Sequence, residues 1–212
     1  RPAVDSHPRV DGRFRAIRGP VPRPMGTWAV ASASMPETPT PRPTVTIRVA
    51  TRGDAEAMRT IYNHEVENFT TTLDMVPRSL ADQQAWIAAR SGAFAAIVAV
   101  IDDSVSADDG LVVGFASLSP FKDRPAYSPT VENSIYVARS HAGLGIGRKL
   151  MERLISDARD SGFHSMIARV ETGGDASLGL HRACGFELVG VEKQVGRKFR
   201  RWLDVATLQL ML

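Results

Sequence analysis

Three glycines at alternate positions, Gly143, Gly145 and Gly147, constrain the fold of this chain more than any other feature. The alternating apolar residues of 130–137 just before them are typical of a β-strand, and the amphipathic pattern after them is typical of a helix. Glycine allows successive backbone N–H groups to converge with no side chain in the way. These donors and the positive end of the helix dipole predict a pyrophosphate-binding turn.

Several kinds of phosphate-binding turn share this strand–turn–helix layout. A Walker loop requires Gly-Lys-Ser/Thr, whereas Gly147 is followed by Arg148 and Lys149, which excludes that class. A dinucleotide fingerprint requires its third glycine one residue later, and the preceding strands have an antiparallel pattern. A turn for the pyrophosphate of coenzyme A (CoA) remains, with Arg148 and Lys149 adding positive charge. The plainer alternative is a turn that only packs a helix against a strand.

The pattern over 44–212 predicts one domain with the element order β-α-α-β-β-β-α-β-α-β-β. We expect an α/β fold with a mixed, mostly antiparallel central sheet of about six to seven strands flanked by four helices. The sequence signals of the helices include a capping box at Ser79 and Asp82. Strands are expected at 45–49, 94–101, 111–121, 130–137, 165–171, 186–195 and 201–210, and helices begin near 54, 79, 147 and 176.

Residues 1–43 differ in composition from the rest of the chain. They hold nine of the thirteen prolines, and seven arginines against three acidic residues. Such a segment cannot bury enough apolar surface to form a core, so we expect a disordered extension. The alternatives are an export signal ending near 28–34, or a start site placed too early, with Met25 or Met35 as the true first residue.

The charge of the predicted domain argues against a polyanionic partner. The basic excess lies in 1–43, which leaves 44–212 with a net charge of −1. We therefore expect no nucleic-acid partner. No apolar run approaches the roughly 20 residues of a membrane span. The chain has one cysteine, Cys184, which cannot form an internal disulfide and fits a cytoplasmic location.

These residues resemble the GCN5-related N-acetyltransferase (GNAT) superfamily. Its cofactor loop, Gln/Arg-x-x-Gly-x-Gly/Ala, aligns with 142–147 of this chain. Within the superfamily, the chain from Val45 onward is similar to the phosphinothricin and methionine sulfone/sulfoximine acetyltransferase branch. The matching pieces, in order, are IYNHEV (61–66), FKDRPAY (121–127), TVENSIYV (130–137), GFHSMIA (162–168), LHRACGF (180–186) and KFRRWLD (198–204).

The resemblance implies an enzyme that moves the acetyl group of acetyl-CoA to the amino group of a small amino-acid-like acceptor. Transfer would be direct, within a ternary complex, with no metal, in a homodimer. The implied cofactor-binding residues are Ile135, Tyr136, Val137, Ala142, Gly143, Leu144, Gly145, Ile146, Gly147, Arg148, Asp175 and Ser177. The implied acceptor-binding residues are Lys122, Arg124, Tyr127, Thr130, Val131, Phe69 and Thr71.

Acetyl transfer needs a neutral amine, and an α-amino group with a pKa near about 8 is mostly protonated at neutral pH. Glu132 is the candidate base, at the position where the branch has its active-site glutamate. His181 stands where many superfamily members have a tyrosine that protonates the leaving thiolate. It is therefore either a general acid or a residue with a structural role in packing or CoA positioning. In the superfamily, a bulge in the strand before the turn presents a main-chain N–H to the thioester, here within 134–137.

Three departures from the family pattern keep alternatives open. Ala142 replaces Gln or Arg, Asp175 replaces an Asn that contacts pantetheine, and Arg200 stands where relatives often have Gly. One alternative is the same fold acting on a polyamine, an aminoglycoside or a protein N-terminus. Another is a catalytically silent acyl-CoA-binding sensor.

Overall fold

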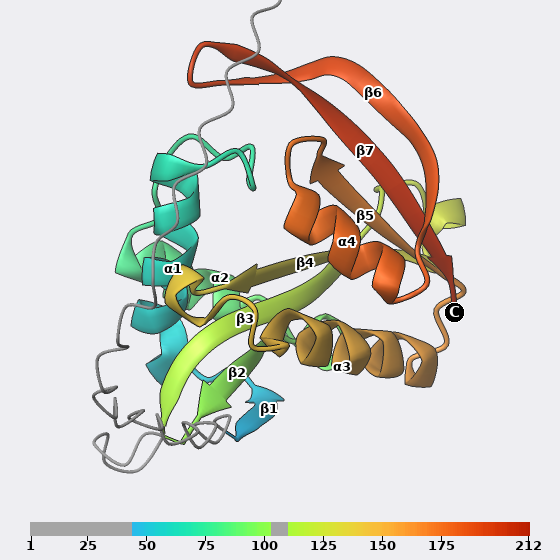
Figure 1. Ribbon diagram of the computed structural model, residues 1–212. Coiled ribbons are helices and arrows are strands. Elements are labelled where there is room, and N and C mark those ends of the chain that lie inside the picture. Colours follow the sequence, from blue (N-terminus) through green and yellow to red (C-terminus); the bar gives the residue numbers. More distant parts are fainter. Residues whose placement is uncertain (1–43, 103–109) are drawn as a thin grey trace, which may run out of the picture. The chain divides into compact units, whose positions relative to one another are not determined.

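Seven strands form one sheet in the order β1-β2-β3-β4-β5-β7-β6 (Figure 1). The computed structural model describes residues 44–102 and 110–212, so the extension at 1–43 and most of the loop expected at 102–110 lie outside the described residues. The strands are β1 (Val45–Val49), β2 (Ile97–Ile101), β3 (Leu111–Pro120), β4 (Thr130–Val137), β5 (Ser165–Glu171), β6 (Glu187–Lys198) and β7 (Arg201–Met211).

Four α-helices accompany the sheet, and the predicted element order is confirmed. They are α1 (Ala55–Asn68), α2 (Leu80–Ala88), α3 (Ile146–Asp160) and α4 (Asp175–Ala183). Two strand boundaries differ from the prediction by more than one residue. β2 begins at Ile97 and not at 94, because Gly92–Phe94 form a 3-10 turn, and β6 continues to Lys198. None of the described helices is long and apolar enough to cross a membrane.

The predicted capping box at the start of α2 is present. The Ser79 hydroxyl accepts a hydrogen bond from the Asp82 N–H at 3.1 Å, and the Asp82 carboxylate accepts one from the Ser79 N–H at 3.2 Å. A cap of this kind contributes about 1 kcal/mol to helix stability. Asp54, just before α1, accepts hydrogen bonds from the Nη1 and Nη2 atoms of Arg48 at 2.7 and 2.8 Å. These bonds fix the start of the helix to β1.

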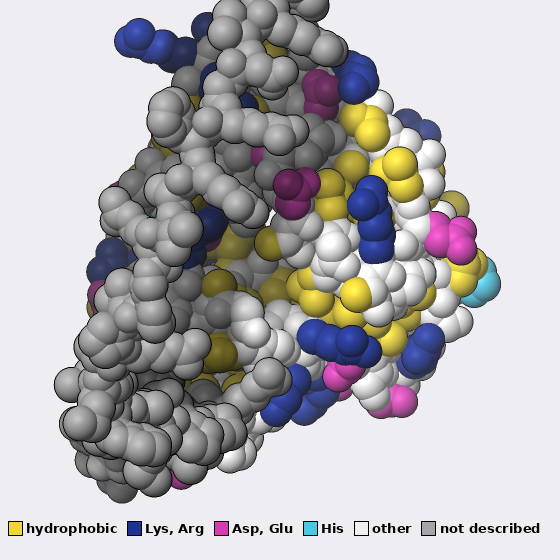
Figure 2. Space-filling model, in the orientation of Figure 1, with side chains coloured by type: hydrophobic (Ala, Val, Ile, Leu, Met, Phe, Trp, Pro, Cys, Tyr) yellow, Lys and Arg dark blue, Asp and Glu magenta, His cyan; other side chains and the backbone are white. Residues whose placement is uncertain are grey.

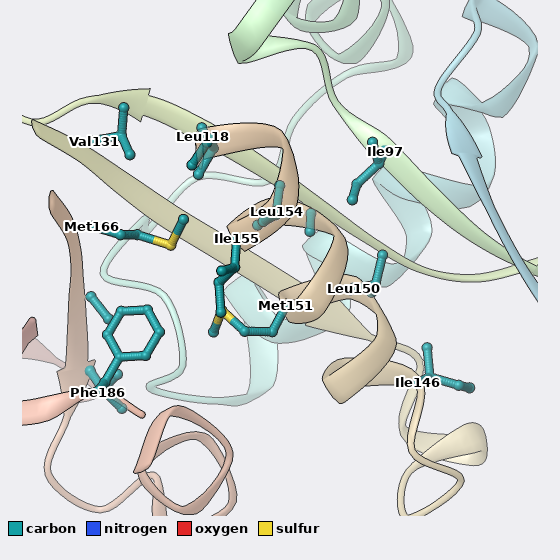
Figure 3. Packing of buried hydrophobic residues seen from close by; sticks show 14 of the residues in the cluster. Ile97, Leu118, Val131, Ile146, Leu150, Met151, Leu154, Ile155, Met166 and Phe186 are labelled. Atoms are coloured by element: carbon teal, nitrogen blue, oxygen red, sulfur yellow. The ribbon is translucent and has the colours of Figure 1, made fainter. Parts of the chain in front are cut away.

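The helices lie on both faces of the sheet. α3 packs the apolar side predicted for it against one face, where Leu150, Met151 and Leu154 are almost fully buried (Figure 3). α1 and α2 pack on the opposite face, around Phe115 of β3. Burying one side chain of this size contributes roughly 1.5–3 kcal/mol, so these two layers supply most of the driving force for folding.

β4 and β5 are the parallel pair in this sheet, and their pairing is short. It joins Thr130 to Ser165, Val131 to Met166 and Glu132 to Ile167, after which the two strands separate. On its other side, β4 stays paired with β3 from Val131 to Val137 without a shift in register. The sheet is therefore split along one line, between the second half of β4 and the second half of β5.

β6 and β7 form a long hairpin that arches past the end of β5 (Figure 1). Its turn consists of Phe199 and Arg200, and both have positive φ angles, 49° and 62°. Two positive φ values are typical of a type I′ turn, in which residues other than Gly, Asn or Asp are strained.

We expect Arg200→Gly to stabilise the fold by about 0.5–1 kcal/mol, because glycine adopts this conformation without a clash at Cβ. Denaturant unfolding of both proteins measures the change. The control is Arg201→Gly at the first residue of β7, where glycine should destabilise by a similar amount. A lower unfolding midpoint for Arg200→Gly would contradict the explanation by strain.

Candidate active site

The line between β4 and β5 is held open by two polar side chains. The Asn133 amide donates to the Ile167 carbonyl at 3.0 Å, and the Asn133 Oδ1 lies 3.1 Å from the His181 Nε2. Both side chains are buried, with 7% and 4% of their surface exposed. These contacts take the place of further strand pairing and lie at the base of a gap in the pairing, called here the fork, between 133–137 and 168–171.

Main-chain donors line the β4 side of the fork. The Ala138 N–H donates to Val113 of β3, and the Thr130 carbonyl accepts from Phe121, so the even-numbered backbone groups point toward β3. The N–H groups of Ile135 and Val137 must then point to the opposite side, where no described strand pairs with them. The bulge expected within 134–137 is wrong, since the register of β4 with β3 is unbroken. These N–H groups are left without a strand partner because β4 and β5 separate after Glu132.

The glycine-rich turn lies at the open end of the fork. Gly143 and Gly145 have φ angles of +78° and +79°, and a Cβ added to either would meet nothing within 4 Å. No described residue accepts a hydrogen bond from the N–H groups of Gly145, Ile146, Gly147 or Arg148 in the first turn of α3. Free donors, open space and the helix dipole together fit a pyrophosphate.

Other predicted cofactor residues have varied surroundings. The Ile146 side chain is 1% exposed and belongs to the core, so only its backbone is available. Arg148 pairs with Glu152 at 2.8 Å on the surface of α3. Asp175 is the exposed first residue of α4, and the Ser177 carbonyl lies 2.8 Å from the His181 Nδ1. Ala142 donates its N–H to the Arg139 carbonyl at 3.2 Å, so its backbone contact is internal.

Glu132 is the last β4 residue paired with β5. Val131 and Ile135 pack with α3, whereas Tyr136 packs with α1, so alternation along the strand places Glu132 on the α1 side of the sheet. Burial raises the pKa of Glu132, and the positive charge of Arg169 partly offsets that rise. No described residue donates a hydrogen bond to its carboxylate, which leaves the group available to a ligand.

His181 is held from both sides. Its Nδ1 lies 2.8 Å from the Ser177 carbonyl and its Nε2 lies 3.1 Å from Asn133 Oδ1. The Asn133 amide nitrogen already donates to Ile167, so both ring nitrogens face acceptors. A neutral imidazole has one N–H and cannot serve both. Burial lowers the pKa of His181 below its ordinary value, and the contact with the Ser177 carbonyl offsets part of that shift.

The predicted acceptor residues fall into two groups at opposite ends of β4. Lys122 and Arg124 lie in the exposed loop between β3 and β4, and the Lys122 ammonium lies 4.7 and 5.1 Å from the rings of Phe121 and Tyr127. Thr130 begins β4 beside this loop. The Val131 side chain is fully buried in the α3 layer, so it cannot line the α1 side.

The second group lies in the loop between α1 and α2, called here the acceptor loop (69–79). The Arg139 guanidinium lies 3.4 Å from the centroid of the Phe69 ring and 3.5 Å from the Thr71 hydroxyl. The same guanidinium binds the buried Glu65 carboxylate with two hydrogen bonds of 2.8 Å. The acceptor loop is therefore attached to the segment that precedes the glycine-rich turn.

Sequence reasoning missed Asn133 and Arg139. Asn133 lies between Val131 and Ile135 on the buried face of β4, and a polar residue in such an apolar series is a signal that could have been read. Arg139 gave no such signal, because its partner Glu65 is 74 positions away along the chain.

Comparison with known proteins places the chain in a family. The model of the acetyltransferase (GNAT) family matches residues 58–186. The chain is 40% identical over 166 residues to the L-methionine sulfoximine/L-methionine sulfone acetyltransferase of Pseudomonas paraeruginosa, covering 78% of this chain and 94% of that protein. It is 36% identical over 165 residues to the phosphinothricin N-acetyltransferase of Alcaligenes faecalis, covering 77% and 81%.

A solved structure gives the same picture. The phosphinothricin acetyltransferase of Sinorhizobium meliloti, determined with acetyl-CoA, matches with a TM-score of 0.73 and 36% identity, over 80% of this chain and 89% of that one. The chain belongs to the acetyltransferase (GNAT) family, and it is an N-acetyltransferase. The predicted fold class and family are confirmed.

We expect Asn133→Ala to cost about 2–4 kcal/mol of folding free energy, because it leaves the Ile167 carbonyl and the Nε2 atom of His181 buried without a partner. Denaturant unfolding checks this value. The control is Gln209→Ala, which removes an amide that donates to the Ser165 hydroxyl at 2.8 Å across strands that remain paired. That change should cost about 1 kcal/mol. Equal losses would mean that the fork does not depend on Asn133.

Proposed function

We propose that this enzyme transfers the acetyl group of acetyl-CoA to the amino group of a small amino-acid-like acceptor. The observation that carries the proposal is the position of Glu132. Burial raises the pKa of its carboxylate, none of the described residues donates a hydrogen bond to it, and it lies at the base of the fork, beside main-chain N–H groups that no described strand pairs with. The names of the relatives support methionine sulfoximine, methionine sulfone and phosphinothricin as acceptors, and the Sinorhizobium structure supports acetyl-CoA as co-substrate.

The chemistry follows from these groups. Glu132 accepts a proton from the acceptor ammonium, directly or through a water, and its raised pKa makes it a better base than an exposed glutamate. The neutral amine then attacks the thioester carbonyl within the ternary complex, and the carbon–sulfur bond breaks. The second proton of the amine nitrogen passes to the departing thiolate, so the products are the acetylated amine and CoA with a free thiol. The N–H groups of Ile135 and Val137 are the proposed donors to the oxyanion, and those of the α3 first turn hold the pyrophosphate.

For His181 we propose the positioning role. Both ring nitrogens face acceptors, the Ser177 carbonyl and the Asn133 Oδ1, and the ring is 4% exposed. Because the ring is buried against these two groups, we assign it to holding Asn133 and not to protonating the thiolate. A pH–rate profile separates the roles: an essential acid of lowered pKa would make activity fall as pH rises past a value below 6.5. Activity that persists above that value supports the positioning role.

The acceptor's carboxylate and its phosphinate, sulfone or sulfoximine group need cations or hydrogen-bond donors. Lys122 and Arg124 are the proposed residues, with Tyr127 beside them, because their loop adjoins the end of β4 that carries Glu132. Phe69 and Thr71 of the acceptor loop are proposed to form the opposite wall. The cytoplasmic location that the single cysteine suggested stays a prediction.

We expect Glu132→Gln to lower kcat at least about tenfold, since an amide cannot accept the acceptor's proton. Wild-type kcat/KM should rise with pH through an apparent pKa above the ordinary glutamate value of 4.5, and this limb should vanish in the variant. Release of free CoA, followed with a thiol reagent and each of the three acceptors, measures both. Glu187→Gln, an exposed strand glutamate, is the control and should behave as wild type. Unchanged turnover in Glu132→Gln would exclude the proposed base.

A homodimer is the proposed assembly. β6 is a sheet edge of twelve residues, and it exposes apolar side chains that include Leu188 at 53% and Val189 at 62%. Trp202 of β7 is 60% exposed beside it. Figure 2 shows hydrophobic side chains scattered among polar ones on the part of this face that grey atoms do not cover. A long apolar edge favours self-association through a second copy of the same strand.

We expect the wild type to sediment as a dimer, and Val189→Lys to sediment as a monomer, because the substitution places a charge in the proposed interface. Sedimentation across a concentration series distinguishes the two states. Val49→Lys is the matched control, since Val49 is 51% exposed on β1 at the other edge of the sheet. A monomeric wild type, or a dimeric Val189→Lys, would argue against this interface.

A further inference from the structure

The side chain of Arg139 contacts the end of α1 and the acceptor loop. Its guanidinium donates to both oxygens of Glu65 at 2.8 Å, with Nε and Nη2 each taking one oxygen. Glu65 is at the end of α1, from which the acceptor loop leaves, and its side chain is only 5% exposed. The guanidinium also lies over the Phe69 ring at 3.4 Å. The Nε and Nη2 atoms on Glu65 and the face of the guanidinium over Phe69 thus fix the first residues of the acceptor loop.

The backbone of Arg139 is fixed just as closely to the glycine-rich turn. The Arg139 carbonyl accepts the Ala142 N–H at 3.2 Å, and the Ala138 carbonyl accepts the His141 N–H at 2.8 Å. Ala138 is itself bonded to Val113 of β3 at 2.8 Å. Arg139 is the first residue of the 3-10 turn Arg139–His141, which leads into the segment whose N–H groups face the proposed pyrophosphate site. A ligand that orders the turn also orders Arg139.

The other attachments of the acceptor loop come from elsewhere. Thr70 donates to Glu171 at the end of β5 at 2.9 Å, and the Thr72 carbonyl accepts from Lys198 at the hairpin tip at 2.8 Å. Asn63 of α1 exchanges two hydrogen bonds with Arg78 near the loop's end. Among the described side-chain contacts of this loop, those from the segment 138–147 are all made by Arg139.

We propose that Arg139 is a positioning residue that couples the two substrate sites, so that acetyl-CoA bound at the glycine-rich turn orders the acceptor loop and tightens acceptor binding. The inference rests on the proposed function for the identity of the two ligands. Coupling between binding sites is reciprocal, so the acceptor tightens acetyl-CoA by the same factor. Coupling of this kind favours the ternary complex over either binary complex, without any contact between Arg139 and the reacting atoms.

The side-chain chemistry explains why arginine is required. A guanidinium is planar and can bind a carboxylate with two parallel hydrogen bonds while its face stacks on an aromatic ring. A lysine at the same position keeps the charge but makes a single-point contact and cannot stack in the same way. Arg139→Lys therefore removes the geometry of the link while it keeps a cation beside the buried Glu65.

The first test is hydrogen–deuterium exchange of the full chain with acetyl-CoA alone. In the wild type, saturating acetyl-CoA should slow the exchange of amides in 69–79 by about fivefold or more, and in Arg139→Lys it should leave them unchanged. The control is Arg59→Lys, since Arg59 also binds a glutamate, Glu56, with two hydrogen bonds of 2.9 and 2.6 Å on the exposed side of α1. The control should match the wild type. Equal slowing in Arg139→Lys, or none in the wild type, would overturn the coupling.

The second test is kinetic. At saturating acetyl-CoA, Arg139→Lys should raise the acceptor KM about tenfold while kcat changes by less than about threefold, since the residue acts on binding and not on the chemical step. Glu65→Gln, which weakens the same link from α1, should repeat this pattern. A purely structural role would lower kcat and thermal stability together. Lack of turnover on all three acceptors would count against the proposed function, whereas the exchange experiment judges Arg139 by itself.

Discussion

The separation of β4 from β5 after Glu132 is the constraint on which the site depends. Three residue pairs join the two strands, and Asn133 and His181 then occupy the space where further pairs would form. A strand that loses its neighbour exposes main-chain donors in fixed positions at no cost in reorganisation, which is what stabilisation of an oxyanion requires. The same separation leads to the glycine-rich turn, so the proposed donors for the thioester and for the pyrophosphate follow one another along a single stretch of backbone. The positions of these proposed donors thus depend on how the strands pair, and not on any one side chain.

Alternation along β4 divides the work between its two faces. Val131, Asn133 and Ile135 face the α3 layer and hold the sheet together, whereas Glu132 and Tyr136 face the α1 side, where the acceptor is proposed to bind. Because the side-chain period of a strand is two, a one-residue shift in register would exchange every one of these roles. The unbroken pairing of β4 with β3 fixes the register, and this explains why the predicted bulge is unnecessary here. Residues that pack the core and residues proposed to act in catalysis therefore alternate along β4, and they project from opposite faces of the sheet.

Much of the fold could be predicted because the signals are local. The order of strands and helices, the capping box at Ser79 and the glycine-rich turn all depend on residues close together in the sequence. The start of β2 was misplaced because Phe94 continues the apolar run, although Gly92 with a φ of +56° turns the chain before it. Long-range features left no such trace. Nothing in the periodicity of β4 or β5 states how many residues pair, and the link of Arg139 to Glu65 depends on tertiary structure. For Val131, predicted to bind the acceptor, the side chain lies in the α3 layer, so only its backbone is available to a ligand on the α1 side.

The short joint between β4 and β5 also bears on how long the protein survives in a cell. The two halves of the sheet, β1 to β4 and β5 to β7, meet through three backbone pairs and the buried amide of Asn133. A ligand that fills the fork supplies contacts that the missing pairs do not, and anything that binds only the folded form stabilises it in proportion to the logarithm of its concentration. The proposed co-substrate would then supply contacts between β4 and β5 while it is bound, and these contacts would be lost when it leaves. The level of acetyl-CoA would set the lifetime of the enzyme against proteolysis as well as its rate.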